Sequence, residues 1–241
     1  MDWQAHRREA HALGRMQEFL KQIVYGGNDG IVTTFAIVAG FAGAQADGVA
    51  QIGGVAVLVF GLANLFADAV SMGLGDFLST RSQHDLYRNR RASEMCEIIE
   101  DPEHERMELF EILRQRGVPS GEADTLTTIV ARHPDLMADL MMTYEFGMLD
   151  PDEDSPALSG LMTFASFVVF GAVPLVPYFV LEPTSQTFWL SVCSTGAALV
   201  ALGVVRWNAT GERLVRTVGE TVMVGTVCAL VAFVVGAVVG G

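Results

Sequence analysis

The sequence predicts an all-α membrane protein with five helical spans and a helical cytosolic insert between the second and third spans. Of its 241 residues, 51% are hydrophobic, and the mean hydropathy is +0.37, yet the formal net charge is −13. These values are compatible only if charge is segregated, and 18 of the 28 acidic residues lie between Asp85 and Asp154. The chain therefore combines stretches that suit lipid with one acidic stretch that suits water.

Five hydrophobic stretches are candidate spans, since a helix needs about 20 mainly apolar residues to cross a membrane. They comprise residues 23–44, 52–78, 158–181, 188–205 and 218–239. The first opens with a polar segment, residues 25–30, before it becomes apolar.

The positions of Lys and Arg predict the orientation of these spans. All 15 basic residues fall within residues 7–21, 81–132 and 206–216, and the connections near 46–51 and 182–186 have none. Positive residues stay on the cytoplasmic side, so we expect the N-terminus and the insert in the cytosol. The absence of a recognisable secretory or organelle-sorting signal favours a prokaryotic cell membrane.

These observations divide the chain into four parts. They are a cytosolic amphipathic segment (1–21), the first two spans (22–81), the insert (82–156) and the last three spans (157–241). No breaker separates the second span from residues 80–99, so one long helix is expected to enter the insert. Pro102, residues 117–119 and Pro134 then divide the rest of the insert into three shorter helices.

Carboxylates recur in the insert at steps of three residues, which place side chains on neighbouring positions of a helix face. The candidate metal ligands are Glu94, Glu97, Glu105, Glu108, Glu111, Met141, Met142 and Glu145. Such carboxylates repel one another unless a cation lies among them. Oxygen ligands with thioethers nearby suit a divalent transition metal better than calcium or magnesium. A solvated acidic face is the alternative interpretation.

Polar residues within the predicted spans mark a candidate transport path, because a charge at this depth is costly unless it faces a pore or a partner. Asp29 opens the first span, and Asn64, Asp68, Met72 and Asp76 follow at steps of four along the second. Such steps form one polar stripe on an apolar helix. Helix-packing hydrogen bonds are the alternative for each residue alone, and Asp29 is also a candidate cap of its own helix.

Other classes of function find little support. Cys96, Cys193 and Cys228 form no C-x-x-C pair and are expected to be packing residues. The acidic balance disfavours nucleic acid as a partner. No phosphate loop, dinucleotide fingerprint or nucleophile elbow is present, so we expect neither an enzyme nor a permanently bound cofactor.

Four segments resemble signatures of the vacuolar iron transporter family. They are Asn28-Asp-Gly-Ile-Val-Thr-Thr-Phe-Ala-Ile-Val-Ala-Gly40, Ser71-Met-Gly-Leu-Gly75, Met141-Met-Thr-Tyr-Glu145 and Pro174-Leu-Val-Pro-Tyr178. The resemblance extends from about Gln22 to the C-terminus. It implies a homodimer of five-span subunits in membrane lipid that moves Fe²⁺, and often Mn²⁺, out of the cytosol in exchange for protons. Co²⁺ and Zn²⁺ are further candidate ions.

The resemblance also implies residue roles. A transmembrane metal site at the dimer interface would use residues that match Asp29 and Met72. The cytosolic domain would bind metal through residues that match Glu94, Glu97, Glu108, Glu111, Glu145, Met141 and Met142. Glu105 has no such match and is an extra ligand or a solvated neighbour.

The chain departs from the family pattern in the second span. Asn64 stands where a glutamate is common, and Asp68 stands where a small residue is usual. We expect Asp68 to replace the missing carboxylate from one turn further along the helix, about 6 Å away. Proton coupling depends on this replacement, because protons and metal compete for the same carboxylates.

Two alternative functions stay open. A membrane-anchored di-iron ferroxidase would use paired Glu-x-x-His motifs, whereas the insert offers only Asp101-x-x-His104. A metal-sensing protein would bind the ion without moving it. The ligand types do not separate iron from manganese, and Glu220 has no assigned role.

Overall fold

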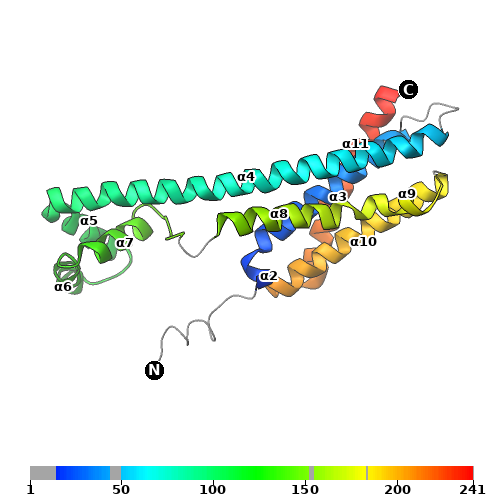
Figure 1. The fold of residues 1–241 in the computed structure, drawn as a ribbon. Helices are drawn as coiled ribbons and strands as arrows, with labels where there is room; N and C mark the ends of the chain where they lie inside the picture. Colours follow the sequence, from blue (N-terminus) through cyan, green and yellow to red (C-terminus); the bar gives the residue numbers. More distant parts are fainter. Residues whose placement is uncertain (1–14, 44–49, 152–154, 183, 241) are drawn as a thin grey trace. The chain divides into compact units, whose positions relative to one another are not determined.

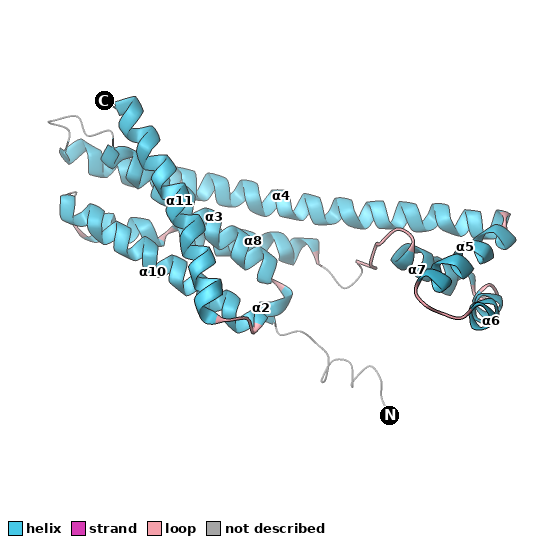
Figure 2. Cartoon of the chain, turned by 180° about the vertical axis from the view of Figure 1, so that it is seen from behind, coloured by secondary structure: helices cyan, strands magenta, loops and turns pink. Residues whose placement is uncertain are grey.

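The computed structural model describes residues 15–43, 50–151, 155–182 and 184–240, and every regular element in these ranges is a helix (Figures 1 and 2). The elements are α2 (Arg15–Glu18), α3 (Leu20–Gly43), α4 (Ala50–Glu100), α5 (Pro102–Gln115), α6 (Ser120–Val130), α7 (Pro134–Tyr144), α8 (Pro156–Gly171), η1 (Val173–Leu175), α9 (Val176–Val180), α10 (Ser185–Thr210) and α11 (Leu214–Gly240). The long helix expected to enter the insert is α4, and the expected breaks separate α5, α6 and α7. Most of the amphipathic segment predicted at residues 1–21 lies outside the described residues.

Two compact units make up the chain. We name Met1–Phe77 with Ala157–Gly241 the membrane unit, and Leu78–Pro156, which contains the predicted insert, the insert unit. The helix α4 contributes residues to both units.

The helix α3 is central to the membrane unit, where it packs against α10 and α11. Its side chains Ile31 and Val38 are fully buried. Gly30 lies against the backbone of Phe167 on α8, so a Cβ at this position would clash. Small residues of this kind let helix backbones approach closely in a membrane protein.

The predicted third span is not one continuous helix. The helix α8 ends at Gly171, and the 3₁₀ turn η1 and the short helix α9 follow. Pro174 and Pro177 account for the break, because proline lacks an N–H and clashes with the preceding helical turn. Ser191 on α10 donates a hydrogen bond to the carbonyl oxygen of Pro174 (2.6 Å), so an acceptor at the break is satisfied.

Four helical segments in the described ranges are long and apolar enough to cross a membrane. They are Val55–Glu100, Pro156–Val180, Ser185–Thr210 and Leu214–Ala232. The protein is therefore a membrane protein with several candidate spans. The polar residues Asn28 and Asp29 lower the hydropathy of α3, which is not among the four. Because α3 is packed among other helices, it does not need an apolar surface on every side.

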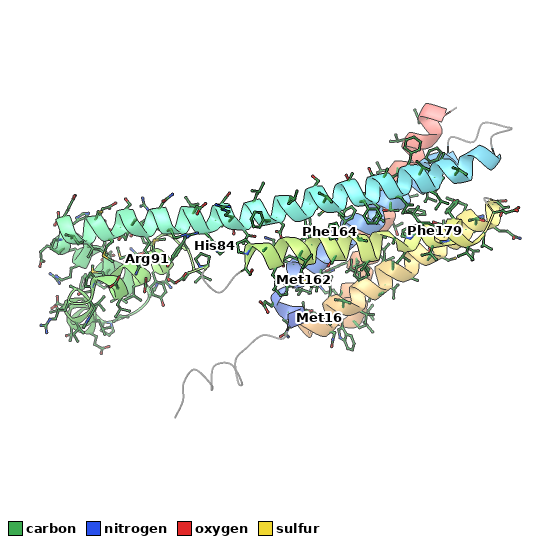
Figure 3. The ribbon with its side chains drawn as sticks, in the orientation of Figure 1. Met16, His84, Arg91, Met162, Phe164 and Phe179 are labelled. Atoms are coloured by element: carbon green, nitrogen blue, oxygen red, sulfur yellow. The ribbon has the colours of Figure 1, made fainter. Side chains whose placement is uncertain are left out.

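The insert unit has a hydrophobic core between α4, α5 and α7. Its buried members are Ile98, Leu109, Met137, Ala138 and Met141. Arg91 lies on the part of α4 that belongs to the insert unit (Figure 3). It donates from Nε to Asp139 (2.9 Å) and from Nη2 to Asp135 (3.3 Å), both on α7. These two ion pairs reinforce the contact that the core makes between α4 and α7.

Candidate metal sites

Two glutamates of the insert unit are buried together, Glu94 on α4 and Glu105 on α5. Glu94 is 1% exposed and Glu105 is 3% exposed, and their carboxyl groups are close enough for a hydrogen bond when one of them is protonated. One oxygen of each, Oε1 of Glu94 and Oε2 of Glu105, is buried without a hydrogen-bond partner among the described residues. Buried oxygens without partners are costly, and carboxylate oxygens are the atoms that a divalent cation binds.

This glutamate pair retains a proton at neutral pH. Burial raises the pKa of Glu94 to about 8, and the hydrogen bond to Glu105 and the charges of Glu105, Glu145 and Glu97 act in the same direction. Burial also raises the pKa of Glu105, although the hydrogen bond from Glu94 opposes this shift. One proton shared by the two groups relieves their repulsion.

Three more predicted ligands, Glu97, Glu108 and Glu145, lie close enough for their charges to act on the pair. Partial loss of hydration, followed by the charges of Glu108 and Glu105, raises the pKa of Glu145. We name these five glutamates the glutamate cluster. Within the described ranges no three His, Cys, Asp or Glu side chains already form a closed ligand set, so a metal ion would need side-chain rotation to be held by the cluster.

The other predicted ligands of the insert are placed differently. Met141 and Met142 are fully buried, and Met141 belongs to the hydrophobic core. Glu111 is exposed and accepts a hydrogen bond from Nε2 of Gln115 (3.4 Å). Glu105 is thus more central to the cluster than Glu111, although the family resemblance matches Glu111 and not Glu105.

Two arginines, not singled out from the sequence, hold the residues on either side of Glu145. Arg90 on α4 lies over the ring of Phe146, with its guanidinium carbon 3.9 Å from the centroid, and Arg116 lies over the ring of Tyr144 at 4.2 Å. Such cation–π contacts contribute roughly 0.5–1 kcal/mol each at exposed sites. They tie the end of α7 to α4 and to the end of α5, and thereby restrain Glu145.

A second group of polar side chains lies in the membrane unit. Asn64 Nδ2 donates a hydrogen bond to Asp68 Oδ2 (2.6 Å) on the same face of α4. The carboxylate of Asp68 is close enough to that of Asp29 on α3 for their charges to interact. Met72, one turn further along α4, is partly buried against the hydrophobic core. Because α3 begins at Leu20, Asp29 lies inside the helix, and the interpretation of Asp29 as a helix cap is wrong.

Asp76 belongs to a separate polar network. Its Oδ2 accepts hydrogen bonds from Ser159 Oγ (2.8 Å) and Thr163 Oγ1 (3.0 Å) on α8, and Gln22 Nε2 on α3 donates to Ser159 Oγ (2.5 Å). One carboxylate thus joins three helices, which supports the helix-packing interpretation of Asp76. Sequence reasoning missed Ser159 and Thr163, whose spacing of four on an apolar helix was the available signal.

Glu220, which had no assigned role, pairs with two arginines. It accepts hydrogen bonds from Nη2 of Arg206 (3.2 Å) and Nε of Arg216 (3.1 Å). Arg206 also donates from Nη1 to Thr221 Oγ1 (2.9 Å). Because these contacts connect α10 with α11, Glu220 has a structural role.

Known proteins resemble this chain over most of its length. The model of the VIT family matches residues 20–237. The chain is 32% identical over 234 residues to vacuolar iron transporter 1 of Arabidopsis thaliana, and this match covers 97% of the chain and 90% of that protein. It is 32% identical over 216 residues to vacuolar iron transporter 1 of Oryza sativa subsp. japonica, and this match covers 90% of the chain and 83% of that protein. It is 31% identical over 228 residues to the vacuolar iron transporter of Plasmodium falciparum, and this match covers 91% of the chain and 81% of that protein.

Proposed function

The chain belongs to the VIT family, and from this premise we propose that it transports ferrous iron across a membrane, out of the cytosol, in exchange for protons. Manganese(II) is an alternative cargo, because carboxylate ligands suit both ions. The metal ion and the proton are both substrates, and the mechanism needs no permanently bound cofactor.

The observation that carries this proposal is the buried pair of Glu94 and Glu105, in which one oxygen of each carboxyl group receives no hydrogen bond from any other group among the described residues. A divalent cation that binds here displaces the proton and satisfies both oxygens. The surrounding carboxylates raise the local concentration of cations. A thioether of Met141 or Met142 would favour ferrous iron over magnesium, which requires oxygen ligands.

We assign the transmembrane step to Asp29, Asp68 and Met72. A hydrated ion must lose part of its water shell within a membrane, and these side chains replace that water. Asn64 orients the carboxylate of Asp68 through its 2.6 Å hydrogen bond. Protons that enter from the far side compete for the same carboxylates and release the metal.

The proposed topology has five spans, with α3 as the first and the N-terminus and insert unit in the cytosol of a prokaryotic cell. Its support is the charge distribution of the sequence and the packing of α3 among the other helices. The proposed assembly is a homodimer. Large apolar side chains on α4, including Val59, Phe66 and Leu74, are exposed, as contact with lipid or a second subunit requires.

The test is transport by the purified protein in liposomes that contain an interior metal-sensitive dye. We expect Fe²⁺ uptake that a proton gradient stimulates and that Asp29→Ala abolishes. Glu220→Gln is the matched control, because it changes an acidic residue of the same unit that pairs with arginines. Saturable metal binding without flux would contradict the proposal and favour a sensor.

The structure gives the ferroxidase alternative little support. The carboxylate of Asp101, in the Asp-x-x-His motif, accepts a hydrogen bond from the backbone N–H of His104 and caps α5. Metal-stimulated oxygen consumption by the liposomes would favour that alternative.

A further inference from the structure

His104 is an imidazole beside the glutamate cluster that the proposed function does not use. Its backbone N–H donates to Asp101 Oδ1 (3.2 Å), which defines the start of α5. Residues four apart share a helix face, so His104 and Glu108 point in the same direction. The capped first turn thus holds a nitrogen ligand next to a predicted oxygen ligand.

The distance between these two side chains suits a shared metal ion. His104 Nε2 lies 3.1 Å from Glu108 Oε1. Two ligand atoms at this separation subtend roughly 95° at a metal with bonds of about 2.1 Å, close to the right angle between neighbouring ligands of an octahedral ion. An ion bound between these two atoms would therefore keep them near their present separation.

The same two side chains are linked to the buried centre of the cluster. Glu105 follows His104 in the sequence, and its carboxylate interacts electrostatically with both His104 and Glu108. Glu94 and Glu105 are each more than nine-tenths buried, and each has an oxygen without a hydrogen-bond partner among the described residues. These free oxygens are an independent sign that the cluster is built for a ligand.

We propose that His104 is a nitrogen ligand of the insert site and biases it towards ions that favour imidazole, such as Fe²⁺, Co²⁺ and Ni²⁺, over Mn²⁺. Imidazole suits iron, nickel and zinc, whereas carboxylate sites suit manganese and magnesium. The inference rests on the proposed metal-binding function of the glutamate cluster. It adds a source of selectivity that the carboxylates alone do not provide.

The test uses the full-length protein in detergent at one fixed pH, with Co²⁺ as the spectroscopic probe and Mn²⁺ as the comparison ion. The variants are His104→Ala and His104→Gln. His133→Ala is the matched control, because His133 is an exposed histidine of the same unit whose side chain makes no cap hydrogen bond. Titration measures the affinities, and cobalt X-ray absorption detects the outer-shell scattering of a coordinated imidazole. Circular dichroism checks that each variant is folded.

We expect both His104 variants to bind Co²⁺ about tenfold more weakly or worse, with a change of less than about twofold for Mn²⁺. The imidazole scattering is lost in these variants and kept in His133→Ala. Unchanged Co²⁺ affinity and scattering in His104→Ala would overturn the inference and leave the glutamate site intact. Equal losses for both ions with the imidazole scattering retained would also overturn it, since His104 would then act only on the fold. A wild-type protein that binds neither ion saturably would overturn the proposed function as well.

Discussion

The insert unit and the membrane unit treat their carboxylates differently. In the insert unit, Glu94 and Glu105 are buried against each other with two oxygens unpartnered among the described residues. In the membrane unit, Asp76 accepts hydrogen bonds from two hydroxyl groups and Glu220 accepts them from two arginines. Carboxylates whose oxygens the protein satisfies hold helices together, whereas carboxylates left with free oxygens are available to a proton or a metal ion.

Asp68 lies between these two cases, and its replacement has the largest expected effect. It has one amide donor, Asn64, and it faces the charge of Asp29. We expect Asp68→Asn to abolish iron flux, since an amide of the same shape cannot bind a cation by charge. The liposome uptake assay measures the loss.

Asp76→Asn is the matched control, because it makes the same change on the same helix at a carboxylate whose donors are Ser159 and Thr163. This variant should retain most of the flux, since an amide oxygen still accepts both hydrogen bonds. Equal flux in the two variants would remove the distinction between path and packing carboxylates.

The next largest effect is expected for metal binding to the insert unit. Glu94→Gln removes a charge that the metal would use, so we expect the affinity for divalent ions to fall about 10- to 100-fold. Glu122→Gln, at an exposed glutamate in the first turn of α6, should leave it unchanged. Isothermal titration of the full-length variants measures both, and an unaltered affinity in Glu94→Gln would exclude this glutamate as a ligand.

The metal-free insert unit should become less stable as the pH rises. A salt-bridged carboxylate has the opposite effect, because it stabilises a protein less as the pH falls. The pKa of Glu94, about 8 in the folded protein, lies above the ordinary value of 4.5. The folded state therefore binds the proton more tightly, and the stabilisation present at low pH is lost as the pH rises towards 8.

We expect the melting temperature of the metal-free unit to fall by about 5 °C or more between pH 5 and pH 8. Hydrogen exchange of the α5 amides, corrected for intrinsic rates, can follow the same change in the full-length protein. Glu94→Gln should flatten the dependence, and excess metal should reverse it. A rise in stability over this interval would contradict the shared proton.

The smallest effect is expected at the exposed ion pair of Glu220. Arg216→Ala should lower the melting temperature only slightly, because exposed ion pairs contribute little to stability. Arg206→Ala should cost more, since Arg206 also donates to Thr221 and to the carbonyl oxygen of Thr217. Thermal unfolding of the two variants compares their stabilities, and a larger loss in Arg216→Ala would contradict the assignment of Arg206 as the main polar link between α10 and α11.

Hydropathy and proline positions were sufficient to predict much of the fold. They indicated the long helix α4 and the three short helices after it. Of the five predicted spans, four correspond to helical segments that are long and apolar enough to cross a membrane among the described residues. The broken third span was missed because length and hydropathy do not report a local turn, although Pro174 and Pro177 are visible in the sequence.

Helical spacing predicted the glutamate cluster but not which members lie at its centre. Three residues along a helix fall about 60° short of a full turn. Glu105 and Glu111 are two such steps apart, so they lie about 120° apart around α5. Only packing against α4 decides which side is buried, and it selects Glu105. The contact between Arg90 and Phe146 joins residues far apart in the sequence, so no local pattern reveals it.

The central claim is that a metal ion takes the place of the proton shared by Glu94 and Glu105. Titration calorimetry at pH 7, in buffers of different ionisation enthalpy, measures directly how many protons leave when metal binds. We expect the release of about one proton per ion bound at this pair in the wild-type protein and about none in Glu94→Gln. Metal binding without proton release, or equal release in the two proteins, would contradict it.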